Sequence, residues 1–220
     1  MLPGQAIAAI LLAFLPILLL LLFTDVVAVS FAKLGLPPIM VFLLFAAAVV
    51  GSVINIPLWE RSAGFLPGGF YRVGRLLYYK PPTMSAQIIA VNVGGAIVPL
   101  LLSLWLLTRA AFWKVLLATA VMVLLSHAVA RVQPGTGVVM PVFVPPLASA
   151  ALAWVLARVR GSRLEAAPIA YISGSMGTLI GADLLNLGRL DALGPGVLSI
   201  GGAGVFDGVF LVGIVAVFLA

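Results

Sequence analysis

The sequence predicts an all-α fold, a polytopic bundle of about seven transmembrane helices that forms a single transmembrane domain over residues 1–220. Hydrophobic residues make up 64% of the chain and charged residues only 8%. A water-soluble domain cannot cover that much apolar surface, whereas a bilayer accommodates it. The apolar residues also fall into runs close to the ~20 residues that a membrane span requires, and the gaps between the runs are short.

Seven membrane segments follow from these runs, and the first is expected to be a retained span. It lacks a basic leader and a small-residue cleavage site, so it does not resemble a signal peptide. The predicted segments are residues 5–31, 38–58, 86–107, 111–130, 138–157, 167–187 and 205–220.

The fifth segment is predicted to be broken. Its first half contains Pro141, Pro145 and Pro146, and each proline removes a backbone donor and clashes with the preceding helical turn. Irregular backbone at membrane depth survives only inside protein or beside water. The segment is therefore either a kinked full span or a re-entrant loop.

The gaps carry the basic residues, and the net charge is +6. Basic residues between apolar runs are placed to meet lipid headgroups, so we expect a bilayer as the partner and no nucleic acid. The longest gap, residues 59–83, mixes aromatic and basic side chains, which is typical of an interfacial belt and alternatively of a docking surface. The chain has no cysteine and only one histidine, His127, so we expect no metal site and no cofactor.

The acidic residues are the first place to look for function, because a charge in hydrocarbon costs about 2.5–3.5 kcal/mol even on mild insertion scales. Three of the six acids lie in gaps next to an arginine, where we expect solvated charges: Glu60, Glu165 and Asp191. The other three lie in apolar surroundings: Asp25, Asp183 and Asp207.

Asp183 and Asp207 are the candidate catalytic pair. Asp183 comes near the end of the sixth segment and Asp207 near the start of the seventh, so a short connection brings both to one side of the membrane. Two close carboxyls cannot both ionise cheaply and would share a proton. Such a pair suits aspartyl hydrolysis or proton and cation transport, while structural capping of nearby backbone is the third interpretation.

The sixth segment carries two different faces. Ser173, Gly177 and Gly181 recur every four residues and predict close packing against another helix. At 100° per residue, Asp183 falls nearly opposite this stripe, on the side of Asn186. The helix therefore has one face for packing and one that bears a carboxyl and an amide.

Further residues complete the predicted site. We expect Gly202 and Gly204 to permit close approach of an extended substrate, with Asn186, Pro145 and Pro146 as other substrate-binding positions. Asn55 and Asn92 are predicted either to bond across helices or to line a polar cavity, and Asp25 could be a third acid in such a cavity.

The runs 168–174 and 181–186, followed by 201–210, resemble an uncharacterised family of bacterial and archaeal membrane proteins, domain of unknown function 1614. Residues 55–58 and 90–95 also resemble that family. The resemblance covers most of the chain and implies a polytopic protein of a prokaryotic cytoplasmic membrane. It implies no established activity.

The chain also bears a more distant resemblance to intramembrane aspartyl proteases of the presenilin and prepilin-peptidase type. In those enzymes one Asp lies on one span and a second follows Gly-x-Gly on a later span, which would correspond to Asp183 and Asp207. Two residues separate Gly204 from Asp207 here, no Tyr precedes Asp183, and the Pro-Pro-Leu of residues 145–147 comes before both acids.

The leading functional hypothesis is an intramembrane aspartyl protease-like protein acting on a membrane-embedded peptide. The alternatives are a proton- or cation-coupled transporter that uses the same acids on a small ion, and a non-enzymatic scaffold. A homo-oligomer is compatible with each of these hypotheses.

Overall fold

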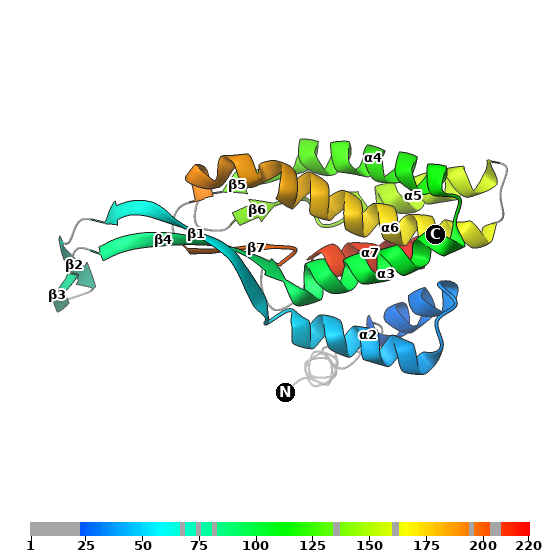
Figure 1. Cartoon of the computed structure of the whole chain (residues 1–220), viewed down its shortest axis with the longest axis horizontal. Helices are drawn as coiled ribbons and strands as arrows, with labels where there is room; N and C mark the ends of the chain where they lie inside the picture. Colours follow the sequence, from blue (N-terminus) through cyan, green and yellow to red (C-terminus); the bar gives the residue numbers. More distant parts are fainter. Residues whose placement is uncertain are drawn as a thin grey trace, which may run out of the picture.

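The fold combines a helical bundle with β-strands, as a computed structural model shows for residues 23–66, 69–73, 76–80, 83–133, 137–159, 163–193, 196–202 and 208–220. The helices lie side by side, and two long strands leave one end of the bundle as an arm (Figure 1). The predicted all-α bundle of seven membrane segments is therefore wrong. Among the described residues, only Phe112–Val129 forms a helix both long and apolar enough to cross a membrane.

The helices begin and end as follows. The first described helix covers residues 23–33. The later α-helices are α2 (Pro38–Gly51), α3 (Val98–Leu106), α4 (Phe112–Val129), α5 (Val144–Arg158), α6 (Ala166–Thr178) and α7 (Gly208–Leu219). The described residues also form two π-helical turns, η1 (Val93–Ile97) and η4 (Leu179–Asp183), and three 3₁₀ segments, η2 (Leu107–Arg109), η3 (Arg163–Glu165) and η5 (Leu184–Leu193).

The described strands form three small sheets. The first has the order β1 (Asn55–Leu66), β4 (Thr83–Asn92), β7 (Gly196–Ile200), with β1 antiparallel and β7 parallel to β4. The others are antiparallel hairpins, one of β2 (Gly69–Val73) and β3 (Leu76–Lys80), the other of β5 (Arg131–Gln133) and β6 (Gly137–Val139).

Two predicted spans failed because each apolar run contains a helix and a strand. The run 38–58 changes at Gly51, after which the Ser52 hydroxyl donates to the Val49 carbonyl at 2.7 Å and closes α2. The run 86–107 begins as β4, whose Ile88 and Ile89 are β-branched and suit a pleated strand. Average hydropathy does not separate such strands from helices.

The predicted interfacial gap, residues 59–83, contributes most of the arm instead of a connecting loop. It contains the outer parts of β1 and β4 and the β2–β3 hairpin. Exposed aromatic side chains occur here, including Trp59 and Tyr79, and the ring centroids of Phe70 and Tyr79 are 5.2 Å apart.

The fifth predicted segment is not broken where we expected. Residues 137–139 form β6, and a regular helix, α5, then begins at Val144. Pro145 and Pro146 lie in its first turn, where the backbone N–H groups have no helical partner, so proline is tolerated. Both prolines are buried.

The centre of the bundle is α6, whose residues are all buried. Small side chains allow this. A Cβ atom at Gly177 would overlap Met122 of α4, and one at Gly181 would overlap the Val123 carbonyl. The predicted close packing at these two glycines is therefore confirmed, and α4 is the helix that they contact.

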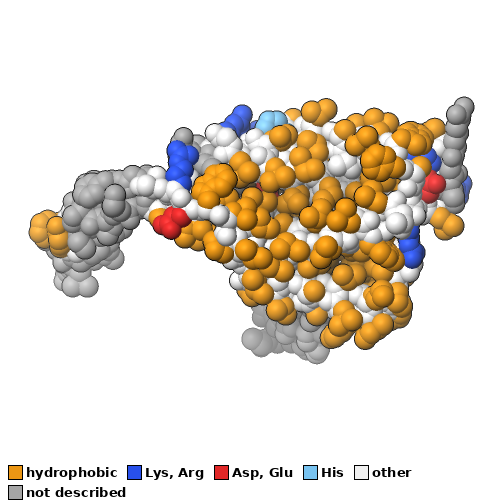
Figure 2. All heavy atoms as spheres, viewed as in Figure 1, with side chains coloured by type: hydrophobic (Ala, Val, Ile, Leu, Met, Phe, Trp, Pro, Cys, Tyr) orange, Lys and Arg blue, Asp and Glu red, His pale blue; other side chains and the backbone are white. Residues whose placement is uncertain are grey.

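The helices run between two ends of the bundle. The strand end carries the junction with β1, β4, β5 and β7; the loop end carries the turn at residues 34–37, the connection 107–111 and η3 (Figure 1). Figure 2 shows hydrophobic side chains spread over the side of the bundle, whereas charged side chains gather near its two ends. The exposed apolar residues include Phe42, Leu116 and Leu124.

Candidate functional site

The Asp183 carboxyl lies where the central helix meets the sheet. Asp183 is the last residue of η4, which continues α6 toward the strand end. Its Oδ2 atom accepts a hydrogen bond from the Gly201 backbone N–H at 2.7 Å, and Gly201 directly follows β7. Within the described part of the chain, no other hydrogen bond to this carboxyl and no ion pair with it occurs.

The π-helical turn before Asp183 is held open by neighbouring groups. Gly181 packs on the backbone of α4, and the His127 ring nitrogen Nδ1 lies 3.3 Å from the Gly181 carbonyl. The buried Asn186 donates its amide to the Ala182 carbonyl at 2.8 Å. A π-turn of this kind is often found at functional sites, because it widens the helix and frees backbone groups.

Asn92 and Asn55 form a second part of the same region. They are paired in register across β4 and β1, and the Asn92 amide donates to Asn55 Oδ1 at 3.1 Å and to the Ser52 carbonyl at 2.7 Å. Asn92 Oδ1 accepts from the Gly95 N–H at 2.9 Å, which caps η1. The Ser199 hydroxyl of β7 also donates to Asn55 Oδ1.

Gly201 and Gly202 connect the two parts. Gly201 has φ +81°, and a Cβ atom there would also overlap the backbone of Gly95 and Ala96. A Cβ atom at Gly202 would press on the Asn92 side chain. These contacts join six residues into one cluster, which we call the sheet–bundle junction: Asn55, Asn92, Asp183, Ser199, Gly201 and Gly202.

Other predicted site residues do not join this junction. Pro145 and Pro146 lie at the start of α5, where their carbonyls accept from the Ser149 hydroxyl. Asp25 is exposed on the helix of residues 23–33. Gly204 and Asp207 lie outside the described residues.

Buried polar atoms without a partner occur on α4, on α6 and in η5. Three of them form no hydrogen bond in the described structure: Ser126 Oγ, Thr178 Oγ1 and Asn186 Oδ1. Ser126 is beside Gly181, so this unpaired hydroxyl lies close to the turn that leads to Asp183. Buried polar groups normally have partners, and water satisfies many of those that protein leaves unpaired.

The loop end contains a buried ion pair that sequence reasoning missed. Lys114 Nζ lies 2.6 Å from Glu165 Oε2, with 1% of the Lys114 side chain and 23% of the Glu165 side chain exposed. We had expected Glu165 to be a solvated charge beside Arg163. The signal available in the sequence was Lys114 itself, a cation within the otherwise apolar run 111–130.

Tryptophan–cation pairs also lie at the loop end. The guanidinium carbon of Arg158 is 3.2 Å from the ring centroid of Trp154, and that of Arg109 is 4.2 Å from Trp105. Both tryptophans are partly exposed. Aromatic rings beside cations are typical of the membrane–water interface. The loop end therefore has the mixture of aromatic and basic side chains that we had assigned only to residues 59–83.

No metal-binding group of three or more His, Cys, Asp or Glu side chains occurs among the residues that the structure describes. The chemistry available at the junction is that of a carboxyl, two amides, a hydroxyl and backbone N–H groups.

Comparison with known proteins identifies a family. Residues 49–219 match the family model described as "Protein of unknown function (DUF1614)". No curated protein and no solved structure matches the chain.

Proposed function

We propose that this chain, which belongs to the DUF1614 family, is a multi-pass integral membrane protein that hydrolyses membrane-embedded peptides with Asp183 and Asp207. The single observation that carries the proposal is the Asp183 carboxyl at the sheet–bundle junction. This carboxyl accepts a hydrogen bond at 2.7 Å from the backbone N–H of Gly201, the residue that follows β7. The membrane is that of a prokaryotic cell, as the family resemblance implies.

The outer surface of the bundle supports the membrane placement. Large apolar side chains are exposed on several helices, for example Leu124 of α4 at 71% and Phe42 of α2 at 66%. A soluble monomer rarely exposes a continuous apolar surface of this kind, whereas lipid tails cover one without cost. The tryptophan–cation pairs at the loop end fit the headgroup level of one leaflet.

The packing of α7 supports the participation of Asp207. The Ser175 hydroxyl of α6 donates to the Val209 carbonyl of α7 at 3.4 Å, and a Cβ at Gly213 would overlap Tyr171 and Ser175. The two helices are therefore antiparallel, and the start of α7 points toward the end of α6 that carries Asp183. Asp207 precedes Val209 by two residues in the sequence.

The free side of β7 supports a peptide substrate. Among the described strands, β7 pairs only with β4, so its other edge has no strand partner there. Val197 in this strand is 58% exposed. An extended peptide that added to this edge would follow β7 toward Gly201 and the Asp183 carboxyl.

The chemistry follows from two carboxyls that share one proton. The ionised carboxylate removes a proton from water while the water oxygen bonds to the amide carbon, and the protonated carboxyl gives its proton to the carbonyl oxygen. The tetrahedral intermediate then collapses and the C–N bond breaks: the protonated carboxyl gives its proton to the leaving amine, and one hydroxyl of the intermediate gives its proton to the other carboxylate as the new carbonyl forms, which restores the shared proton.

Cleavage of a fluorescently labelled transmembrane peptide by the reconstituted chain tests the proposal. We expect wild type and Glu60→Gln, which changes an exposed acid of the arm, to cleave at the same rate. We expect Asp183→Asn and Asp207→Asn to reduce the rate by at least about 100-fold, as losses of acid–base groups do. Cleavage that survives both substitutions would eliminate the two-acid mechanism.

A second candidate function, proton- or cation-coupled transport, is supported by the unpartnered buried groups at Ser126, Thr178 and Asn186. Hydrated polar groups next to a buried acid are typical of proton paths in membrane proteins. Proton flux into liposomes distinguishes the two functions. A transporter carries a proton flux that is lost in Asp183→Asn, and it cleaves no peptide. A hydrolase cleaves the peptide and carries no proton flux that depends on Asp183.

A further inference from the structure

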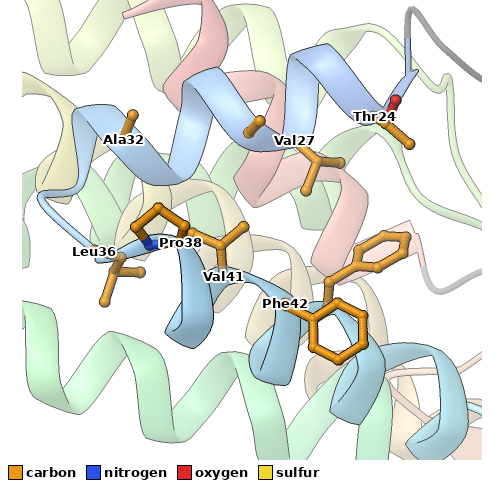
Figure 3. A pocket seen from close by; sticks show the side chains of 9 residues that line it. Thr24, Val27, Ala32, Leu36, Pro38, Val41 and Phe42 are labelled. Atoms are coloured by element: carbon orange, nitrogen blue, oxygen red, sulfur yellow. The ribbon is translucent and has the colours of Figure 1, made fainter.

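An apolar groove lies between the helix of residues 23–33 and α2, away from the sheet–bundle junction. Its volume is about 330 Å³. Figure 3 shows Val27 from one helix and Val41 from the other pointing into the space between them. The lining is almost wholly apolar and includes Val27, Ala32, Leu36, Val41, Phe42 and Phe45.

The groove is continuous with the apolar outer surface of the bundle. Phe42, which lines the groove, is 66% exposed, and its neighbours Ile39 and Leu43 are also exposed. An apolar chain could therefore enter from the side without crossing a polar rim. At about 330 Å³ the groove is at the small end of ligand pockets, which suits one hydrocarbon chain rather than a whole lipid.

One cation, Arg109, marks the end of the groove at the turn 34–37. Lys33 follows the lining residue Ala32 but faces α7, where its Nζ donates to the Phe218 carbonyl at 2.8 Å and to the Val217 carbonyl at 3.3 Å. Arg109 reaches the same turn, where its Nη1 donates to the Leu34 carbonyl at 3.4 Å and abuts Gly35. Within the described residues, neither cation has an acidic partner.

We propose that this groove binds one acyl chain of an anionic phospholipid, with the lipid phosphate held by Arg109 at the turn 34–37. The apolar lining accepts the chain, and the Arg109 guanidinium, which has no acidic partner among the described residues, attracts the headgroup. The turn 34–37 joins the two helices and so sets the distance between the apolar lining and the position of the headgroup. The proposal rests on the membrane placement proposed above and is independent of the hydrolase chemistry.

Native mass spectrometry of the full chain, released from detergent with defined lipids, tests the proposal. The probes are phosphatidylglycerol and phosphatidylcholine with identical acyl chains. We expect one retained phosphatidylglycerol per chain and about fivefold less retained phosphatidylcholine. Attraction between one cation and an anionic lipid surface strengthens binding by about this factor.

Two variants with matched controls separate the parts of the site. Val41→Trp fills the groove and should reduce retained phosphatidylglycerol about tenfold, since several methylene groups lose their burial. Its control, Leu116→Trp, changes an exposed apolar residue of α4 and should change nothing. Arg109→Gln should remove most of the preference for the anionic lipid, whereas Arg158→Gln, which also breaks a tryptophan contact at the loop end, should leave it.

Equal retention of the two lipids by wild type, or unchanged retention in Val41→Trp, would overturn the proposal. If Val41→Trp does not fold, Ala32→Phe fills the groove from the other helix and gives the same test. Flotation of the wild-type chain with liposomes checks the membrane placement separately. A chain that floats but retains no lipid contradicts the groove and leaves the membrane placement intact.

Discussion

Asp183 serves two purposes at the scale of the residue, and they can be separated. Its carboxyl accepts the Gly201 N–H and so ties the end of α6 to the loop after β7. The proposed chemistry requires in addition that the group exchange a proton. An amide in its place can accept the same N–H but cannot take part in acid–base catalysis.

We therefore expect Asp183→Asn to retain the fold and lose activity, and Asp183→Ala to lose both. Asn should change the free energy of unfolding by less than about 1 kcal/mol, whereas Ala leaves the Gly201 N–H unpaired at a cost of about 1–3 kcal/mol. Thermal unfolding in detergent measures the difference. If the two variants are equally stable, the carboxyl does not hold the junction.

Lys114 and Glu165 give a second prediction for single residues. Glu165→Ala leaves the buried Lys114 charge without its partner and should destabilise the protein by about 3 kcal/mol. Arg163→Ala, an exposed neighbour, should have an effect within about 0.5 kcal/mol. The double variant Lys114→Met/Glu165→Leu should recover most of the loss, since paired apolar groups often replace a buried ion pair. A double variant no more stable than Glu165→Ala would contradict this account.

Small residues decide the packing of α6 at the scale of the element. Gly177 faces Met122, and a side chain of any size would overlap it. Gly177→Val should therefore destabilise the bundle by about 1–3 kcal/mol or more through overpacking. Gly188→Ala in η5 is the matched control, because a Cβ there meets nothing within 4 Å. Similar unfolding temperatures for the two variants would show that α4 and α6 do not approach closely.

The elements also show what sequence reasoning could and could not predict. The run 111–130 is apolar apart from Lys114, Thr119, Ser126 and His127, and α4 forms there as expected. The glycine spacing on α6 predicted a close helix contact, because small residues at every fourth position line one face. The β1–β4 arm was missed, since Ile88, Ile89 and Val91 are as apolar as helix-forming residues and only their long-range pairing with β1 makes them a strand.

The candidate site was predictable only in part, because it also depends on long-range pairing of strands. The cost of a buried acid singled out Asp183. The polarity of Asn55 and Asn92 suggested bonds across helices or a polar cavity, whereas the two side chains bond to each other across strands β1 and β4. Their meeting with Gly201 depends on the β4–β7 pairing, which joins residues about 100 positions apart along the chain. No local pattern specifies such a contact.

At the scale of the whole molecule, the account depends on a bilayer around the bundle. The apolar side chains of Figure 2 cover its side, and the charged groups lie toward its ends. Because the chain contains no cysteine, single cysteines can be introduced without background labelling. Leu124 on α4 is 71% exposed in the isolated molecule, and Leu164 at the loop end is 84% exposed.

Labelling of these two positions with a membrane-impermeant maleimide is the most direct measurement. In membrane vesicles of matching orientation, Leu164→Cys should be modified rapidly. Leu124→Cys should be protected until the protein is unfolded in detergent, because lipid covers that face of α4. Equal labelling of Leu124→Cys and Leu164→Cys in intact vesicles would show that water reaches the side of the bundle, and would contradict the membrane placement on which the proposed chemistry rests.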